Sequence, residues 1–486
     1  MEKFYSRAFF LLAALLLGAF FIHLINWADY AFFALNYPYE IDHVEGPIIH
    51  QVSMIAYSLP VYTPLQTAPY IVMNYPPVYH FLTLLFSIAT EDFLMAGRLI
   101  SMLSMLLIGG VIYYLVFNAD REGLSKKSSA IIAALAAGLF IGNYYAQNWS
   151  ILMRVDLLGV LFEIIGVAAF LSIKEKNKKI IVATLFFLLA VYTKQSLFAG
   201  AAACFFSALI YDRKSALKLA TTMAAAGLVI FAIGCFLTDG LFFTHHISAN
   251  INAFSWQQAF NKTGTMLAEH WLIFLCSLIF VVNSLCGKDY EKTALSLFWI
   301  FALIMSLSIG KFGANYNYYL EFITVNSLVF GLALAWFLQN INDKRYIAVN
   351  MLIILTLFVQ LILSVTDINR PWHVQKQGLL EKIADSEIII PNLQKIKGEI
   401  VADNMVLLYN ADRRLYFQPI MMTHMHEIGA WDESAMIADI ENKRLGGFVF
   451  NDFNCDERYS REFMRAVKEN YKQTLSTPHY KLYERK

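Results

Sequence analysis

Charged residues are scarce in this sequence. Only 15% of the 486 residues are Asp, Glu, Lys or Arg, whereas 58% are hydrophobic. Soluble domains carry about 25% charged and about 45–50% apolar residues, so the composition excludes an ordinary soluble protein. The formal net charge of +1 also lacks the positive excess that is typical of nucleic-acid-binding proteins. We therefore expect a membrane protein that has no nucleic-acid partner.

Cysteine is equally scarce. The five cysteines show no CxxC spacing, and four of them lie in apolar stretches. This arrangement excludes a disulfide framework and a structural zinc site as the basis of the fold. The histidine pairs His245-His246 and His424/His426 have no matching carboxylate spacing, so we predict no metal site from them.

The few charged residues are unevenly distributed. Residues 370–486 hold 34 of the 75 charged side chains. We therefore expect two domains, a membrane-embedded domain at 1–369 and a soluble α/β domain at 370–486. In the second domain, short β-like runs at 386–390, 398–403, 446–453 and 480–486 alternate with helical stretches at 377–384 and 460–471.

Long apolar runs recur through residues 1–369. A helix needs about 20 mostly apolar residues to cross the roughly 30 Å hydrocarbon core of a bilayer. The pattern predicts an α-helical polytopic protein with eleven membrane-spanning helices, at 8–28, 97–117, 128–147, 153–173, 179–193, 197–212, 216–238, 267–285, 292–309, 318–338 and 345–365. The first is expected to be an uncleaved anchor, because its run is too long for a signal peptide and no small-residue cleavage site follows.

The distribution of Lys and Arg predicts the side of each loop. Residues 77–90 form a short apolar segment, which suits an interfacial helix better than a span. If this segment stays outside the hydrocarbon, every predicted cytoplasmic segment is basic, and residues 29–76 on the other side contain no Lys or Arg. We therefore predict a plasma (inner) membrane protein with a cytoplasmic N-terminus and an extracytoplasmic C-terminal domain.

The loop between the first two predicted spans, residues 29–96, is too long for a simple connection, so we expect it to be structured. Glu40, Asp42 and Glu45 lie close together in it. Carboxylates that are grouped beside a membrane are candidates for a general base. The alternative is a solvated acidic loop that has no catalytic role.

Five cations lie on the predicted outer face, against the usual bias: Arg98, Arg154, Lys194, Lys262 and Lys311. Ionisable groups at the ends of membrane helices are costly unless they pair or bind something. Snorkelling to headgroups would explain Lys262 and Arg98, whereas a bound anion would explain Arg154 and Lys194. A carboxylate that faces cations at the hydrocarbon boundary suits sugar transfer from a lipid phosphate, since the cations can stabilise the leaving group.

Five segments, in this order along the chain, carry a family resemblance. They are EGPIIHQVSMIAYSLPVYTPL at 45–65, the NYPP…GRL stretch at 74–106, RVDLLGVLFEIIGVAAFL at 154–171, LAVYTKQSLFAG at 189–200 and GANYNYYLE at 313–321. Together they resemble the GT-C superfamily of membrane glycosyltransferases, particularly bacterial relatives of the protein O-mannosyltransferases and lipid A aminoarabinose transferases (glycosyltransferase family 39-like).

The resemblance implies a GT-C fold, a polyprenyl-phosphate sugar donor and a first-loop acid as the base. The family often has adjacent Asp and Glu, whereas Val44 precedes Glu45 here, so the resemblance points to either Glu45 or Asp42. We expect Arg154, Lys194 and Lys311 to bind the donor phosphate. The resemblance also leaves a divalent cation open as a cofactor.

Six further residues are expected to shape the substrate pocket. They are Glu40, Asn74, Tyr75, Arg98, Asn317 and Glu321. Asn317 and Glu321 are one helical turn apart, so they would share a face.

The predicted function is therefore an inverting glycosyltransferase that moves a sugar from a polyprenyl-phosphate donor to a lipid, glycan or protein acceptor outside the membrane. A polytopic transporter or lipid flippase is the alternative. Transporters commonly show inverted repeats and midplane charges, whereas this sequence shows no visible repeat and gathers its charges at one face. A scaffold that only displays the C-terminal domain would need neither Arg154 nor Lys194.

Overall fold

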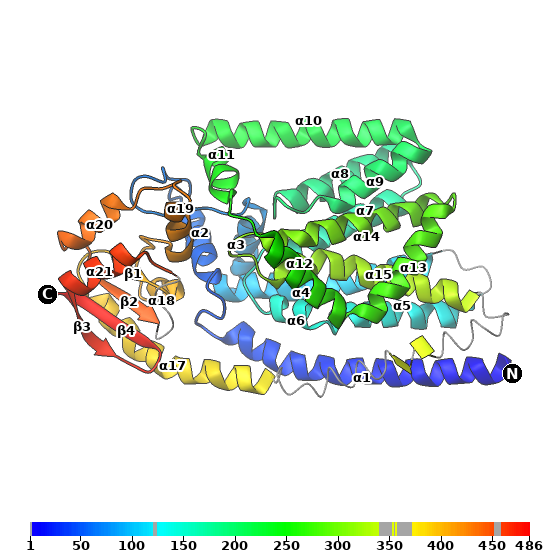
Figure 1. Cartoon of the computed structure of the whole chain (residues 1–486), viewed down its shortest axis with the longest axis horizontal. Helices are drawn as coiled ribbons and strands as arrows, with labels where there is room; N and C mark the ends of the chain where they lie inside the picture. Colours follow the sequence, from blue (N-terminus) through cyan, green and yellow to red (C-terminus); the bar gives the residue numbers. More distant parts are fainter. Residues whose placement is uncertain (1, 120–123, 340–351, 354, 357–371, 452–457) are drawn as a thin grey trace.

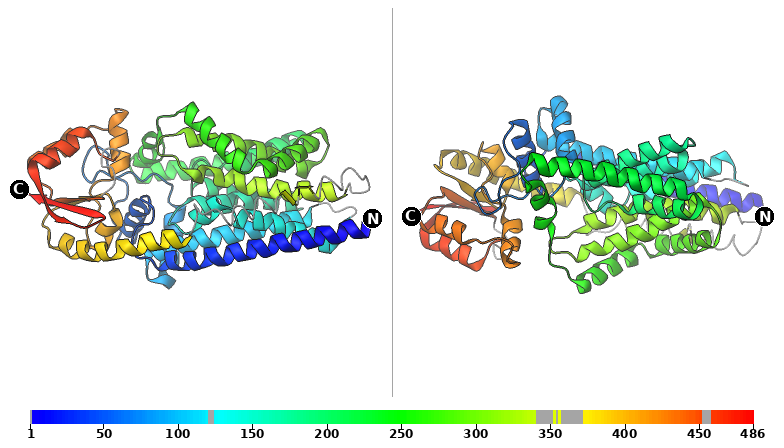
Figure 2. Two further views of the ribbon diagram at one scale, coloured as in Figure 1. Left: turned by 60° about the horizontal axis from the view of Figure 1, so that its bottom comes forward. Right: turned by 90° about the horizontal axis from the view of Figure 1, so that it is seen from above.

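The computed structural model describes residues 2–119, 124–339, 352–353, 355–356, 372–451 and 458–486 (Figure 1). The molecule is elongated, with a helical bundle at the N-terminal end and a small sheet with its helices at the C-terminal end. The first loop lies between these two parts (Figures 1 and 2).

Helices occur at ten of the eleven positions where spans are predicted. They are α1 (Glu2–Asn36), α4 (Phe93–Asn118), α5 (Lys126–Ile141), α7 (Asp156–Ser172), α8 (Lys176–Val191), α9 (Ala199–Tyr211), α10 (Arg213–Leu237), α13 (Trp271–Cys286), α14 (Tyr290–Ser306) and α15 (Leu320–Gln339). The eleventh, 345–365, falls almost entirely outside the described residues.

The length and apolar composition of a helix show whether it could span a membrane. Within the described residues, five are long and apolar enough, or up to seven if each of two bent pairs is one span. One bent pair is α5 with α6 (Tyr144–Ser150), at 61°, and the other is α12 (Trp256–Glu269) with α13, at 94°. The α-helical polytopic class is confirmed, and the count of eleven stays a prediction.

Glycines bring the helices of the bundle close together. A Cβ atom on Gly166 of α7 would lie 2.6 Å from the Phe187 ring of α8, and one on Gly331 of α15 would lie 2.9 Å from Val116 of α4. Small residues at such crossings let helix backbones approach closely, which is the main source of packing between helices in a membrane. The crossings fix the helix ends that carry the candidate site.

The first loop is structured, as its length predicts. It contains α2 (Glu45–Ala56) and α3 (Val78–Thr90), so the short helix predicted at 77–90 is present. Asp92 then caps α4 by accepting a 2.7 Å hydrogen bond from the Met95 amide. The loop also pairs with the C-terminal part, because the Tyr70 amide donates to the Tyr416 carbonyl at 2.8 Å.

The C-terminal part is an α/β unit with a four-stranded sheet in the order β1-β2-β4-β3. Its strands are β1 (Ile400–Ala402), β2 (Gly447–Asn451), β3 (Tyr471–Ser476) and β4 (Tyr480–Arg485). β1 and β2 are parallel, whereas β4 runs antiparallel to both β2 and β3. Its helices are α17 (Trp372–Lys395), α18 (Met405–Asn410), α19 (Pro419–Glu427), α20 (Ser434–Glu441) and α21 (Arg461–Asn470).

One local prediction for this part is wrong, and one strand was missed. Residues 386–390, predicted as β-like, belong to the helix α17, because Leu379, Ser386, Ile389 and Leu393 are buried at helical spacing. Burial of this face outweighs the β propensity of the isoleucines. The edge strand β3 was not predicted, because it exposes most of its side chains and shows no apolar run.

Candidate active site

A cavity of about 360 Å³ opens where the first loop, the helix ends of the bundle and the C-terminal part meet. All three regions contribute polar side chains to its wall: Asp42, His43, Asn74 and Tyr75 from the loop, Arg154, Lys194, Gln195, Lys311 and Asn317 from the bundle, and Asp403, Gln418 and Arg458 from the C-terminal part. The site is therefore assembled from residues far apart in sequence.

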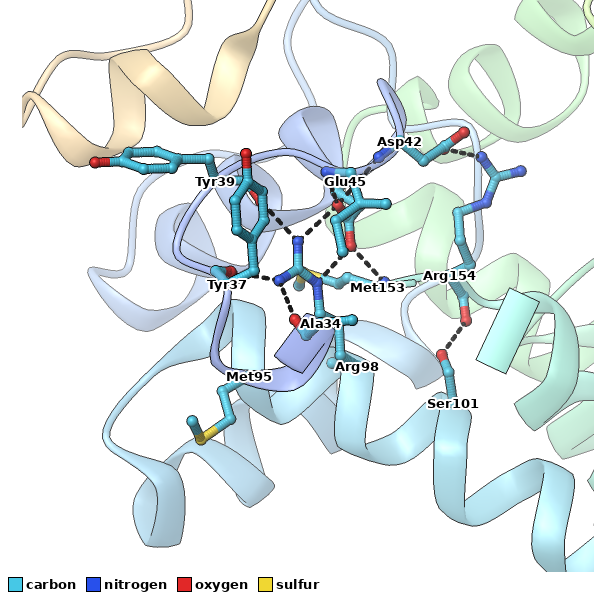
Figure 3. A network of polar contacts seen from close by, with 12 residues as sticks. Ala34, Tyr37, Tyr39, Asp42, Glu45, Met95, Arg98, Ser101, Met153 and Arg154 are labelled. Atoms are coloured by element: carbon cyan, nitrogen blue, oxygen red, sulfur yellow. Dashed lines mark hydrogen bonds and ion pairs between the residues drawn. The ribbon is translucent and has the colours of Figure 1, made fainter. Parts of the chain in front are cut away.

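Arg98 and Glu45 form a closed ion pair beside this cavity (Figure 3). Arg98 Nε lies 2.8 Å from Glu45 Oε1, Nη2 lies 2.9 Å from Oε2, and both side chains are fully buried. The remaining guanidinium N–H groups donate to the carbonyls of Ala34, Tyr37 and Tyr39. All five Arg98 N–H groups thus have acceptors, a geometry that stabilises a buried charge.

The Glu45 carboxylate is also saturated from the other side. Oε1 accepts a 2.8 Å hydrogen bond from the Met153 amide, and Oε2 accepts a 2.7 Å bond from the Ile41 amide. Glu45 is the first residue of α2, where a carboxylate is favoured by the helix dipole. The pair therefore connects the end of α1, the start of α2, α4 and the segment before α7.

A second cluster lies at the cavity wall and alternates in charge. Arg154 Nη1 lies 2.6 Å from Asp42 Oδ1, and Arg154 Nε lies 3.4 Å from Asp156 Oδ2. Asp156 Oδ1 then accepts from Lys194 Nζ and from Asn317 Nδ2, each at 2.7 Å. The cluster is less completely enclosed than the first pair, since the Asp42 side chain is 18% exposed.

The ends of packed helices position these groups. Arg154 and Asp156 flank the start of α7, and the Ser101 hydroxyl of α4 donates to the Arg154 carbonyl at 3.0 Å. Lys194 follows the end of α8, and Asn317 lies in the turn before α15. These four residues lie at or beside helix ends, so the bundle holds them, whereas the first loop brings Asp42 to them.

Lys311 adds a positive charge to the same wall. Its ammonium makes no ion pair with any residue that the structure describes. Burial lowers the pKa of Lys311, and repulsion by Lys194 lowers it further. An anion between these two lysines would relieve both effects.

The pKa values of two carboxyl groups in the loop shift in opposite directions. Burial acts to raise the pKa of Asp42, but Arg154, His43 and the Val44 amide outweigh it and hold that pKa below its ordinary value. For Glu40, burial and the neighbouring Glu45 and Asp42 raise the pKa well above its ordinary value. Asp42 is thus the carboxylate kept ionised at the cavity.

Asn74 joins the bundle side of the cavity to the C-terminal side. Its backbone carbonyl accepts from Gln195 Nε2 at 3.0 Å, and its side-chain oxygen accepts from Gln418 Nε2 at 3.4 Å. Next to it, burial raises the pKa of Tyr75 to about 12, so its hydroxyl remains a hydrogen-bond donor. Both residues line the cavity.

Seven of the eleven predicted site residues line the cavity: Asp42, Asn74, Tyr75, Arg154, Lys194, Lys311 and Asn317. The other four lie outside the lining. Glu45 and Arg98 pair with each other, and Glu40 accepts from the Met405 amide at 3.1 Å. Glu321 is buried in the first turn of α15, four residues after Asn317.

Sequence reasoning missed Asp156, which links Arg154, Lys194 and Asn317. The signal was present, because a carboxylate two residues after an arginine at the start of a predicted span needs a partner. Gln418 and Arg458 carried no such signal, since only the fold brings them to the cavity.

The residues present do not fit a divalent cation. The described part of the chain contains no group of three or more His, Cys, Asp or Glu side chains able to hold one. Asp42, which lines the cavity, instead faces Arg154, and the buried Asp156 faces Lys194. Cations of the protein thus occupy the positions next to the carboxylate oxygens.

No protein-family profile and no curated protein sequence matches the chain. Solved structures do match it. ArnT from Cupriavidus metallidurans in the apo state shares 11% identity over 95% of this chain and 97% of its own, with a TM-score of 0.62. The same protein bound to undecaprenyl phosphate shares 12% identity over 97% of this chain and 97% of its own, with a TM-score of 0.62. A third match is AglB, the oligosaccharyltransferase from Archaeoglobus fulgidus, in complex with an inhibitory peptide and a dolichol-phosphate. It shares 12% identity over 96% of this chain and 74% of its own, with a TM-score of 0.50.

The chain has the GT-C fold. ArnT and AglB share this fold, so the architecture expected from the sequence is confirmed. At 11–12% identity the likeness concerns the fold alone.

Proposed function

We propose that this chain is an inverting glycosyltransferase of the plasma membrane that uses a polyprenyl-phosphate-linked sugar as its donor. The observation that carries the proposal is the cavity at the helix ends, where the ionised Asp42 faces a cluster of cations. The similar fold of ArnT, solved with undecaprenyl phosphate, and of AglB, solved with a dolichol-phosphate, supports this donor class.

The donor phosphate would bind to Lys194, Lys311 and Arg154. Lys311 offers an ammonium without an ion-pair partner in the described chain, and Arg154 Nη2 has no described partner either. Charge-assisted hydrogen bonds from such groups are strong and suit a phosphate. They would also stabilise the negative charge that builds on the phosphate as it leaves.

Asp42 would act as the general base. It accepts the proton of the acceptor hydroxyl while that oxygen attacks the anomeric carbon, and the bond from this carbon to the phosphate oxygen breaks. A single displacement of this kind inverts the anomeric configuration. We assign the role to Asp42 rather than Glu45, because Glu45 is fully buried and both of its oxygens already accept hydrogen bonds.

The remaining predicted residues would support this geometry. Asn317 would hold Asp156 in place, and Asn74 and Tyr75 would shape the wall between donor and acceptor. Glu45 and Arg98 would fix the loop that carries Asp42. We further propose that residues 370–486 form an extracytoplasmic domain that covers the acceptor side, since Gln418 and Arg458 line the cavity there.

Release of free polyprenyl phosphate tests the proposal. Purified full-length protein would be incubated with a panel of polyprenyl-phosphate sugars and a cell-envelope acceptor extract. We expect release by the wild type and a loss of about 100-fold or more in Asp42→Asn, the lower range for removing a general base. Absence of release with every donor, together with lipid or solute movement in liposomes, would replace this function with transport.

A further inference from the structure

Three aromatic side chains form an exposed cluster near the start of α12. Phe254, Trp256 and Phe260 are 43%, 61% and 60% exposed. Their rings still contact one another, with centroids 4.9 Å apart for Phe254 and Trp256 and 5.7 Å apart for Trp256 and Phe260. Large rings gathered on a surface mark a contact with another phase or molecule.

The residues of α12 divide into three faces. Ala259, Thr263 and Met266 are buried against the protein. Trp256 and Phe260, four residues apart, form an exposed apolar stripe. The third face carries the exposed polar residues Gln257, Asn261 and Thr265. A helix with one packed, one apolar and one polar face suits the boundary between a membrane and water.

The orientation of α12 agrees with this boundary. The helix turns by 94° into α13, so it lies in the membrane plane if α13 crosses the membrane. In the right view of Figure 2, α12 projects from one side of the bundle, and α3 projects from the other side. α3 also exposes apolar side chains, namely Phe81, Leu85 and Ile88.

The exposed aromatic cluster connects to the cavity through Phe254 and the neighbouring residues of α12. Phe254 forms a backbone bridge with Lys311, and the Ser255 amide donates to the Gly310 carbonyl at 2.8 Å. Gln258 Nε2 donates to the Ile309 carbonyl at 2.8 Å. The contact leaves no room for a side chain at residue 310, because a Cβ there would lie 2.7 Å from the Phe254 ring.

We propose that α12 is a membrane-surface anchor: Phe254, Trp256 and Phe260 insert at the headgroup boundary of the bilayer, and the bridge from Phe254 sets the height of Lys311 above the hydrocarbon. The indole of Trp256 carries a polar N–H and favours this depth, and phenylalanines are typical of the apolar face of such helices. Lys311 is thereby held at the level where a lipid phosphate lies. Membrane anchoring by α12 does not depend on the proposed function. The role of the anchor in donor binding rests on the proposed function.

Fluorescence quenching of Trp256 tests the anchor. Full-length protein would be placed in phosphatidylcholine nanodiscs whose lipids carry bromine either near the headgroup or at the chain end. The Trp256 signal is the difference between wild type and Trp256→Phe. We expect quenching at least about twofold stronger from the shallow bromines, as for an interfacial ring. Equal absence of quenching at both depths, or stronger quenching from the deep bromines, would overturn the anchor.

A paired variant separates insertion from misfolding. Phe260→Asn should weaken the shallow quenching by about twofold, because it removes half of the apolar stripe. Asn261→Ala, on the polar face, should leave the quenching unchanged, and both variants should keep the wild-type unfolding temperature. A different result would overturn the proposal: Trp256 is not quenched, the wild type is a dimer, and Phe260→Asn is a monomer. This face would then bind a second copy of the chain. Shallow quenching in a protein that releases no polyprenyl phosphate would keep the anchor and reject the proposed function.

Discussion

Two arginines meet carboxylates of the same short acidic segment, but in different surroundings (Figure 3). Arg98 and Glu45 are fully buried and share a bidentate contact. Arg154 and Asp42 also touch, at 2.6 Å, but the Asp42 side chain is 18% exposed and lines the cavity. Both pairs join an arginine to a carboxylate, but only Arg154 and Asp42 can be reached from the cavity.

This difference separates a structural pair from a functional one. A buried ion pair whose hydrogen bonds are all made has nothing left to offer a ligand, and it holds the fold together only while both partners remain. A partly open pair can exchange a partner for substrate. The comparison therefore predicts that changes at Arg98 act on stability, whereas changes around Arg154 act on donor binding and on pH dependence.

The largest effect is expected for Arg98→Ala. Removing the guanidinium leaves the buried Glu45 carboxylate unpaired, which should lower the free energy of unfolding by about 3–5 kcal/mol. Thermal or denaturant unfolding of the purified protein would measure it. Lys262→Ala, which removes another cation of the predicted outer face, is the control. Equal stability of the two variants would contradict the structural role.

Lys194→Met should have a smaller and mixed effect. Asp156 loses its 2.7 Å partner but keeps Asn317 and Arg154, so we expect a stability loss of about 1.5–3 kcal/mol. The donor KM should also rise, because a phosphate ligand is gone. Kinetics per folded molecule separate the two effects. An unchanged donor KM would remove Lys194 from the phosphate site.

Lys311→Ala should affect binding alone. Lys311 has no ion-pair partner among the described residues, so its removal leaves no carboxylate without a counter-charge. We expect an unchanged unfolding temperature and a donor KM raised about tenfold, equivalent to about 1.4 kcal/mol. A loss of stability with unchanged KM would instead make Lys311 a structural residue.

In Arg154→Gln, which should also weaken donor binding, the smallest expected effect is a shift of the pH profile. Arg154 holds the pKa of Asp42 below its ordinary value, so the wild type should lose kcat/KM only at low pH, where Asp42 takes up a proton. Without Arg154, burial raises this pKa, and the acid limb should move to higher pH. Arg154→Lys should restore most of the wild-type profile. An acid limb that stays in place would exclude Asp42 as the titrating base.

Much of this architecture could be predicted from the sequence. Apolar length located ten helices of the bundle, and the shortness of 77–90 predicted the helix α3 within the first loop. Unpaired cations at helix ends pointed to Arg154, Lys194 and Lys311, because such charges need a partner in a membrane. The sidedness that the positive-inside rule predicts stays a prediction.

The rest depended on contacts that only folding creates. Glu45 and Asp42 are three residues apart, and nothing in their spacing shows that one faces Arg98 and the other the cavity. Helical packing of α17 outweighed the β propensity of residues 386–390. Gln418 reaches Asn74 from 344 positions away, so no local pattern could reveal it.

The most direct test of the account compares Asp42→Asn with Glu45→Gln in the release of polyprenyl phosphate, counted per folded molecule. Both changes remove one carboxylate charge from the same loop. We predict that Asp42→Asn folds normally and loses about 100-fold or more of the activity, as expected for a missing general base. Glu45→Gln should instead lose stability, and the molecules that still fold should keep most of the activity. The reverse result, a stable but inactive Glu45→Gln with an active Asp42→Asn, would contradict the account.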